Sequence, residues 1–138
     1  MLMNNPIVNA SSLARSPLRR AALAIAQSAY KALDTQDIIR GSIRRDKQGN
    51  LIIRDCIVPL EQFDHVYLVG VGKSAYQACR ALAPILGKQL TKGFVLDIQG
   101  TSFGRVIVRR GTHPIPSQAN INATAELITL LKQASARD

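Results

Sequence analysis

One stretch changes its apolar period and decides the fold: His65-Val66-Tyr67-Leu68-Val69-Gly70-Val71-Gly72-Lys73-Ser74, with an apolar segment following to Leu86. The residues up to Val69 are mostly β-branched, aromatic or aliphatic, which is typical of a buried strand. Beyond Ser74 the small and apolar residues recur at helical spacing, and Gly87 is a helix stop signal. The sequence therefore predicts a strand, a glycine-rich turn and a helix over residues 65–86.

The turn between this strand and helix has the composition of an anion-binding site. Gly70 and Gly72 permit a positive φ and a close approach of a ligand to the backbone. The helix that begins after Ser74 offers free N–H groups and the positive end of its dipole. Lys73 adds a full positive charge, and ligands of open α/β sheets bind at the carboxyl ends of strands. We therefore expect Gly70, Gly72, Lys73 and Ser74 to bind a phosphate or a carboxylate.

The chain before this stretch predicts two helices and a hairpin. Ser16-Pro17 has the form of an N-cap followed by a first helical residue, and Asp34 begins a second, short helix. Residues 43–58 carry β-branched residues around a polar turn signal, which predicts a small hairpin. Residues 1–15 are rich in Asn and Ser, and we expect them to form a flexible tail.

The chain after this stretch predicts further strands at residues 93–97 and 105–108 and a helix at 119–134. Strands that alternate with helices favour a Rossmann-like α/β fold, in which a mainly parallel sheet is flanked by helices. One domain over residues 16–138 accounts for the pattern. No strand follows the last helix, so we expect a truncated sheet with an exposed edge, and hence a homo-oligomer or poor solubility.

Composition and charge restrict the partners. Lys and Arg number 18 and Asp and Glu number 9, and the resulting net charge of +9 favours anionic ligands. The basic residues are spread along the chain and aromatics make up 4%, which does not favour a nucleic-acid partner. Cys56 and Cys79 lack metal-ligand spacing and indicate reduced thiols in a cytoplasmic protein. No window of about 18 apolar residues predicts a membrane span, and we expect no metal site of the zinc type.

The residues by themselves leave a second hypothesis open. Gly70, Gly72 and Ala75 satisfy the G-x-G-x-x-A form of a dinucleotide-binding fingerprint. Asp97 ends the next predicted strand, where a ribose-binding acid is expected. That carboxylate either contacts a nucleotide or a metal, or caps the next turn. A non-catalytic module that binds a nucleotide or a sugar phosphate, of the dinucleotide-binding or sugar-isomerase type, is therefore the alternative.

Two segments resemble a known family. Residues 64–75 are similar to the G-x-G-K-A segment of the bacterial and archaeal glycerate 2-kinases, which carry a MOFRL domain at their C-terminal end. Gly111-Thr112-His113-Pro114-Ile115-Pro116-Ser117 is similar to the G-H-P-x-P-D loop of that family. The resemblance runs through residues 16–135, and sugar isomerase domains do not ordinarily carry the second motif. The chain thus resembles the N-terminal, Rossmann-like part of a glycerate 2-kinase.

The resemblance implies transfer of the γ-phosphoryl group of ATP, with Mg²⁺, to the 2-hydroxyl of D-glycerate. It implies that Lys73 is catalytic, which suits a reaction that depends on positioning and charge neutralisation. His113 either contacts the substrate or phosphate, or fixes its loop. Ser117 stands where the family has Asp, and Thr112 separates Gly111 from His113. The family's Ser-Gly-Gly-Gly-Ser loop and MOFRL domain do not occur in these 138 residues, so we expect activity to require a missing domain or a C-terminal partner chain.

Overall fold

The computed structural model describes residues 7–138 and confirms the α/β fold. Its central sheet has three parallel strands in the order β4-β5-β6: β4 (Val66–Val71), β5 (Leu90–Asp97) and β6 (Val106–Arg110). β5 is the middle strand and its last five residues are all buried, which explains why it reads as a continuous apolar run. A Cβ added to Gly93 would lie 2.7 Å from a methyl group of Val106, so β5 and β6 pack too closely there for a side chain.

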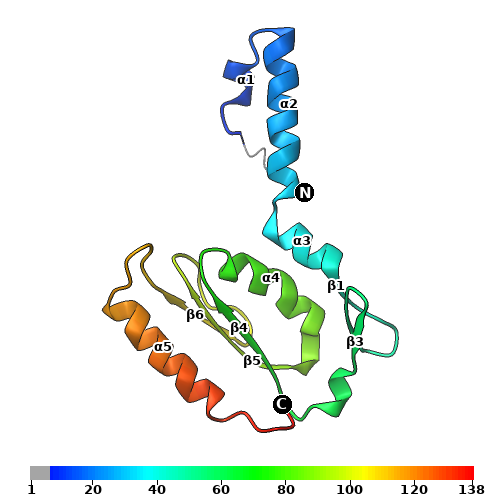
Figure 1. Ribbon diagram of the computed structural model, residues 1–138, viewed down its shortest axis with the longest axis vertical. Helices are drawn as coiled ribbons and strands as arrows, with labels where there is room; N and C mark the ends of the chain where they lie inside the picture. Colours follow the sequence, from blue (N-terminus) through cyan, green and yellow to red (C-terminus); the bar gives the residue numbers. More distant parts are fainter. Residues whose placement is uncertain (1–6) are drawn as a thin grey trace.

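Two helices cover the two faces of this sheet (Figure 1). α4 (Ala75–Leu86) packs on the face that carries Leu68 and Val95, and α5 (Gln118–Leu131) packs on the face that carries Phe94 and Leu96. Because successive side chains of a strand point to opposite faces, Val95 belongs to the apolar cluster under α4, and Phe94 and Leu96 belong to the one under α5. Pro84 lies inside α4.

An eight-residue span, 98–105, connects the parallel strands β5 and β6 without a helix. Phe103 pairs with Val106 in an isolated bridge and packs against the α4 cluster, so the connection is anchored where it turns back. Arg105 donates to the carbonyl oxygens of Leu90 and Lys88 at 2.7 and 3.3 Å. The span is short because it returns only to the level of Gly93, four residues before the end of β5.

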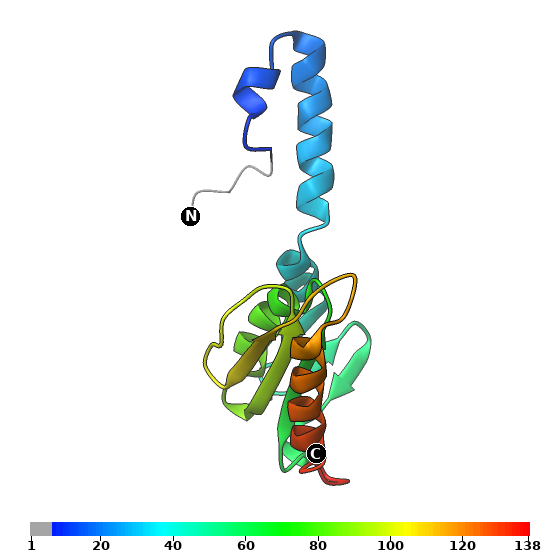
Figure 2. The ribbon, with the colours of Figure 1, turned by 90° about the vertical axis from the view of Figure 1, so that its left-hand side faces the viewer.

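The N-terminal segment forms α1 (Ala10–Leu13), α2 (Pro17–Ala32) and α3 (Thr35–Ser42). Ser16 and Asp34 cap α2 and α3 as predicted: Ser16 Oγ accepts from Arg19 N at 3.3 Å, and Asp34 Oδ1 accepts from Gln36 N at 2.9 Å. α2 projects away from the α/β body with α1 beside it (Figures 1 and 2), and none of its residues is buried. The expected flexible tail lies partly outside the described residues, and its residues 10–13 form α1.

The expected hairpin is one half of a three-stranded antiparallel meander. β1 (Ile43–Arg45) pairs with β2 (Leu51–Ile53), and β2 pairs with β3 (Cys56–Val58). The third strand exists because the chain reverses at Arg54, which adopts a φ of +52°. Short 3₁₀ helices follow at η1 (Leu60–Gln62) and, after α4, at η2 (Gly87–Gln89).

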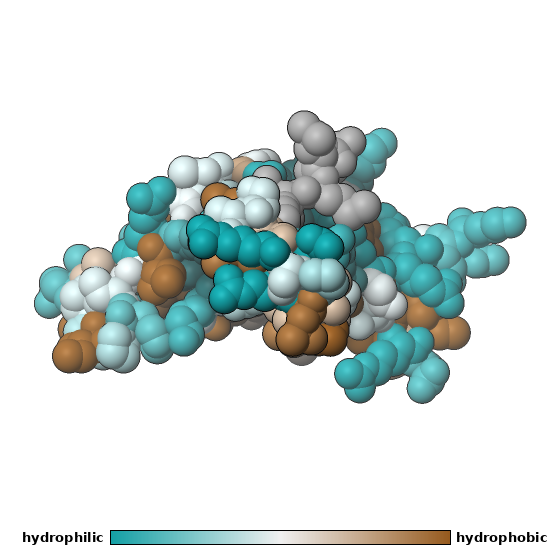
Figure 3. All heavy atoms as spheres, turned by 90° about the horizontal axis from the view of Figure 1, so that it is seen from above, coloured by the Kyte–Doolittle hydropathy of each residue, from teal (hydrophilic) through white to brown (hydrophobic). Residues whose placement is uncertain are grey.

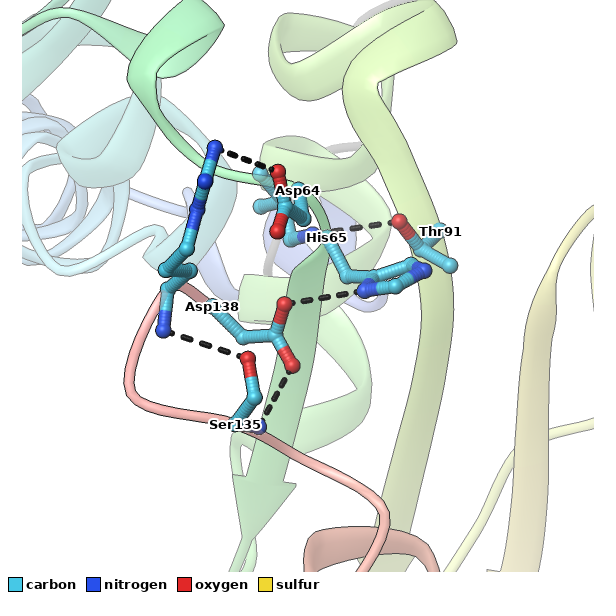
Figure 4. Close-up of polar contacts among 7 residues, drawn as sticks. Asp64, His65, Thr91, Ser135 and Asp138 are labelled. Carbon is cyan, nitrogen blue, oxygen red and sulfur yellow. Dashed lines mark hydrogen bonds and ion pairs between the residues drawn. The ribbon is translucent and has the colours of Figure 1, made fainter.

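The last residues return to the start of β4 (Figure 4). Asp138 Oδ1 lies 2.8 Å from His65 Nδ1, and Asp138 Oδ2 accepts from Ser135 N at 2.7 Å. Arg137 forms an ion pair of 3.0 Å with Asp64, and its carbonyl accepts from Asp64 N at 3.0 Å. We call residues 135–138 with Asp64 and His65 the terminal clasp.

The face of the molecule at the end of α2 is chemically mixed. Seen from the end at which α2 projects, hydrophilic and apolar side chains lie side by side (Figure 3). No helix among residues 7–138 combines the length and apolar character that crossing a membrane requires.

Candidate functional site

The turn between β4 and α4 has the backbone shape that the glycines predict. Gly72 adopts a φ of +118°, a conformation that residues with a Cβ rarely adopt. Its N–H donates to Leu96 O at 3.0 Å and its carbonyl accepts from Ala75 N at 3.0 Å. The turn is thus held against β5 and leads directly into α4, and it presents the exposed Lys73 at the carboxyl end of the sheet.

Gly70 serves packing. A Cβ added to Gly70 would lie 2.6 Å from Cys79 Sγ and 3.2 Å from the Ala75 Cβ. The glycine therefore lets α4 lie close to β4, which is a common use of a glycine in a strand beside a helix. A direct role for Gly70 in ligand binding stays a prediction.

Asp97 occupies the position that we expected a ligand anion to take at the N-terminus of α4. Its side chain is 3% exposed. Oδ2 accepts from the backbone N–H of Tyr76 at 2.8 Å, and Oδ1 accepts from that of Ile98 at 2.6 Å. Ser74, the N-cap residue, makes no side-chain capping bond. A buried carboxylate from the neighbouring strand therefore caps α4, and it also accepts from the turn that follows β5. A contact of Asp97 with a nucleotide or a metal stays a prediction.

The second motif forms a loop that bends over the same edge of the sheet. The loop runs from Gly111, whose N–H donates to Asp97 O at 2.8 Å, to Ser117, which caps α5. Asn120 lies beneath it and bonds to Thr112 at one end and Ser117 at the other. His113, in the middle of the loop, is exposed.

These segments enclose a pocket of about 190 Å³. It lies at the carboxyl ends of β4 and β5, where ligands of open α/β sheets bind. Of the predicted site residues the pocket is lined by Gly72, Lys73, Asp97 and His113, and the remaining lining comes from both motifs and β5. Gly70 and Ser74 are not among its lining residues. Two motifs 40 residues apart thus meet in one cavity, which we call the Lys73 pocket.

Sequence reasoning missed Asn120. The signal was present, because Ser117 and Asn120 have the spacing of a helix capping box. Sequence alone did not indicate that the Asn120 amide also reaches back to Thr112.

The charges in the Lys73 pocket are arranged asymmetrically. The Lys73 ammonium is the one permanent cation among the lining residues, and the Asp97 carboxylate at the base is held by backbone N–H groups. A ligand anion is therefore attracted to the Lys73 side of the pocket and repelled by its base. Behind the turn, burial and the nearby Asp97 charge raise the pKa of the Cys79 thiol to about 11.

A larger cavity of about 570 Å³ lies at the other end of α4, where Arg80, Lys88 and Arg105 contribute to its wall. Its basic character has a structural cause. Arg105 bonds to the carbonyl oxygens around η2, and the Arg80 guanidinium lies 5.1 Å from the centre of the Phe103 ring. This cavity contains none of the predicted site residues.

Residues 7–138 contain no group of three or more His, Cys, Asp or Glu side chains that could hold a metal ion. Asp97 is the one carboxylate lining the Lys73 pocket, and backbone N–H groups already bond to both of its oxygens. Mg²⁺ in phosphoryl-transfer sites is bound by carboxylates together with substrate phosphates. The described residues therefore do not by themselves form a magnesium site.

Comparison with known proteins supports the resemblance. A family model described as "Domain of unknown function (DUF4147)" matches residues 21–138. The chain is 32% identical over 84 residues to the D-glycerate 2-kinase of Thermotoga maritima, an alignment that covers 59% of this chain and 20% of that protein. The crystal structure of the PH0495 protein from Pyrococcus horikoshii OT3 superposes with a TM-score of 0.73 at 24% identity, over 88% of this chain and 27% of that one. The chain thus spans about a fifth of the length of the curated relative, and the predicted likeness to the N-terminal part of a glycerate 2-kinase is confirmed.

Proposed function

The chain belongs to the DUF4147 family, and on that premise we propose that it forms the acceptor-binding wall of an ATP-dependent D-glycerate 2-kinase. The reaction would convert D-glycerate to 2-phosphoglycerate. One observation carries this proposal: the glycine turn with Lys73 and the loop with His113, which the resemblance pairs, line the same pocket.

The size of the pocket favours the small acid over the nucleotide. Sites for drug-sized ligands occupy about 300–1,000 Å³, and a whole nucleotide belongs to that class. The Lys73 pocket has about 190 Å³, which suits a three-carbon hydroxy acid. We therefore assign the pocket to D-glycerate and place the adenosine part of ATP elsewhere.

Lys73 supplies the charge that the acceptor needs. Its ammonium would bind the glycerate carboxylate or an oxygen of the transferring phosphoryl group, and Gly72 permits a close approach of the ligand to the backbone. His113 faces the same cavity and would donate to a substrate oxygen. Asp97 keeps the turn in place and repels an anion from the base of the pocket, which restricts the carboxylate to the Lys73 side.

ATP would supply the γ-phosphoryl group, with Mg²⁺ neutralising its charge. The described residues do not form a magnesium site, so further polypeptide would hold the ion. The chain spans about a fifth of the curated relative, so we propose that turnover uses further polypeptide, either in the same chain or as a partner chain with the MOFRL domain. We propose the cytoplasm as the location and residues 16–138 as the functional domain.

Calorimetric titration of the chain with D-glycerate, 2-phosphoglycerate, Mg²⁺–ATP and NAD tests this proposal. We expect D-glycerate and 2-phosphoglycerate to bind, and Lys73→Ala to weaken both by at least about 10-fold, the loss of one charge-assisted contact. Lys92→Ala is the matched control, because Lys92 is an exposed lysine on β5 outside the pocket. Equal affinities for D-glycerate in the wild type and Lys73→Ala would contradict the proposal, and tight binding of NAD alone would favour the dinucleotide alternative.

A further inference from the structure

We propose that Asn120 is a positioning residue, which holds the loop of residues 111–117 closed and thereby orients His113 toward the Lys73 pocket. The inference rests on the proposed function for its ligand. Asn120 lies in the first turn of α5, three residues after the N-cap Ser117, and its side chain is partly buried beneath the loop.

One amide bridges both ends of the loop. Asn120 Oδ1 accepts from Thr112 N at 3.0 Å and from Ser117 N at 2.9 Å. Its Nδ2 donates to Thr112 O at 3.2 Å. The hydroxyl oxygens of Thr112 and Ser117 each lie 3.1 Å from the same Oδ1. The backbone on both sides of His113 is therefore tied to a single side chain on a rigid helix.

The loop adds one internal bond, from Thr112 Oγ1 to Ile115 O at 2.7 Å. Thr112, the residue that separates Gly111 from His113, thus takes part in the closure: its N–H and carbonyl bond to Asn120 and its hydroxyl crosses the loop. The imidazole of His113 makes no hydrogen bond within residues 7–138, so it is positioned by the backbone beside it and stays available to a ligand. A group held in place before binding costs less entropy when it meets its ligand.

Gly111 shows how tightly the amide is seated. A Cβ added to Gly111 would clash with Asn120 Nδ2 and lie 3.0 Å from Leu96 Cδ1. The glycine at the start of the loop is therefore required by the side chain that closes it. Gly111 and Asn120 act as a pair: a side chain at position 111 would displace the amide, and Asn120→Ala would remove it.

The test compares Asn120→Ala with Asn122→Ala. Asn122 carries the same amide two residues along α5, and it bonds to Gln118 on the exposed surface. We expect Asn120→Ala to shift the NMR signals of the His113 imidazole and of the Thr112 amide, and to weaken D-glycerate binding about 10-fold. Asn122→Ala should change neither. Unmoved His113 signals in Asn120→Ala would overturn the proposal.

A double-mutant cycle separates positioning from a general structural role. If Asn120 acts through His113, Asn120→Ala should weaken D-glycerate binding in the wild type but by less than 2-fold in a His113→Ala background. Equal losses in both backgrounds would overturn the proposal. Asn120→Asp is the second variant if Asn120→Ala does not fold. It keeps the oxygen that accepts from Thr112 N and Ser117 N but sets a second oxygen against Thr112 O, so the His113 imidazole signals should shift in this variant too. Unmoved His113 signals in Asn120→Asp would overturn the proposal.

The two proposals fail differently. If the wild type binds no D-glycerate, the proposed function fails, while the His113 signals of Asn120→Ala still decide whether the loop depends on this amide. If D-glycerate binds and depends on Lys73 but not on Asn120, the positioning role fails alone.

Discussion

The carboxylate of Asp97, at the end of β5, accepts a 2.8 Å hydrogen bond from the backbone N–H of Tyr76 in the first turn of α4. This relationship changes the chemistry of the site. The helix N-terminus already holds a negative charge that belongs to the protein, so we expect an anion to approach Lys73 from the side of the His113 loop. The neighbouring strand thus contributes both the floor of the pocket and its polarity.

Replacement of Asp97 by Ala should destabilise the fold. It leaves the N–H groups of Tyr76 and Ile98 without acceptors and removes the cap of α4. We expect a loss of about 2–3 kcal/mol, from a cap worth about 1 kcal/mol and a buried donor that costs a similar amount or more. Urea unfolding measures it. Asp55→Ala is the control, since Asp55 is exposed in the meander and should stay within about 0.5 kcal/mol of the wild type.

Gly70→Ala should cost about 1–3 kcal/mol, the usual penalty for overpacking, because the new methyl group meets Cys79 Sγ at 2.6 Å. The loss should shrink in a Gly70→Ala, Cys79→Ala double variant, which removes the sulfur. Thermal and urea unfolding of the two single variants and the double variant give the coupling. If the losses of unfolding free energy in the two single variants add up in the double variant, the contact between the new methyl group and the Cys79 sulfur is not the cause of the destabilisation. Gly41→Ala, with nothing within 4 Å, should be neutral or stabilising.

The Cys79 thiol should make stability fall in alkali. Burial raises its pKa from 9.0 to about 11, so the unfolded chain ionises this thiol before the folded chain does. The contribution of this thiol to the free energy of unfolding is complete below pH 9 and is lost as pH rises toward 11. The free energy of unfolding of the wild type should therefore decline over that window more steeply than that of Cys79→Ala. Parallel pH profiles would contradict the prediction.

The terminal clasp should weaken in acid. Backbone bonding from Ser135, together with the His65 side chain, holds the pKa of Asp138 below its ordinary value of 3.8. A depressed pKa stabilises the fold above pH 3.8 and loses that contribution as pH falls through the folded value. Hydrogen exchange at the Asp64 amide, which bonds to Arg137 O, should be faster in Asp138→Asn than in the wild type at pH 6. The difference should narrow below pH 3.8, and an equal rate at pH 6 would exclude a stabilising role for the carboxylate.

The free edge of β4 should support self-association. Gly72 N–H bonds to β5, and neighbouring residues in a parallel strand face opposite sides, so the backbone groups of Tyr67, Val69 and Val71 face away from β5. No described strand pairs with that edge. Light scattering over a concentration series should reveal oligomers, and Val71→Lys, at a position 62% exposed, should reduce them. A monomer at every concentration would contradict this expectation.

Local patterns predicted most of the elements because their causes are local. The caps at Ser16 and Asp34 depend on side chains two or three residues from the N–H groups they accept from. The apolar run of β4 and the helical spacing of α4 follow from periodicity alone. The third strand of the meander was not predicted, because it depends on the reversal at Arg54, a residue that carries no turn signal of its own.

The features of the candidate site were likewise predicted from the sequence only in part. The sequence alone determined that a lysine stands in a glycine turn between a strand and a helix, and that a His-Pro-x-Pro loop follows 40 residues later. Only the tertiary structure decided that Asp97 closes the helix N-terminus, that Gly70 serves packing and that Asn120 bridges the His113 loop. These are contacts between segments brought together by parallel strand pairing and helix packing, and no local pattern records which polar group meets which across that distance.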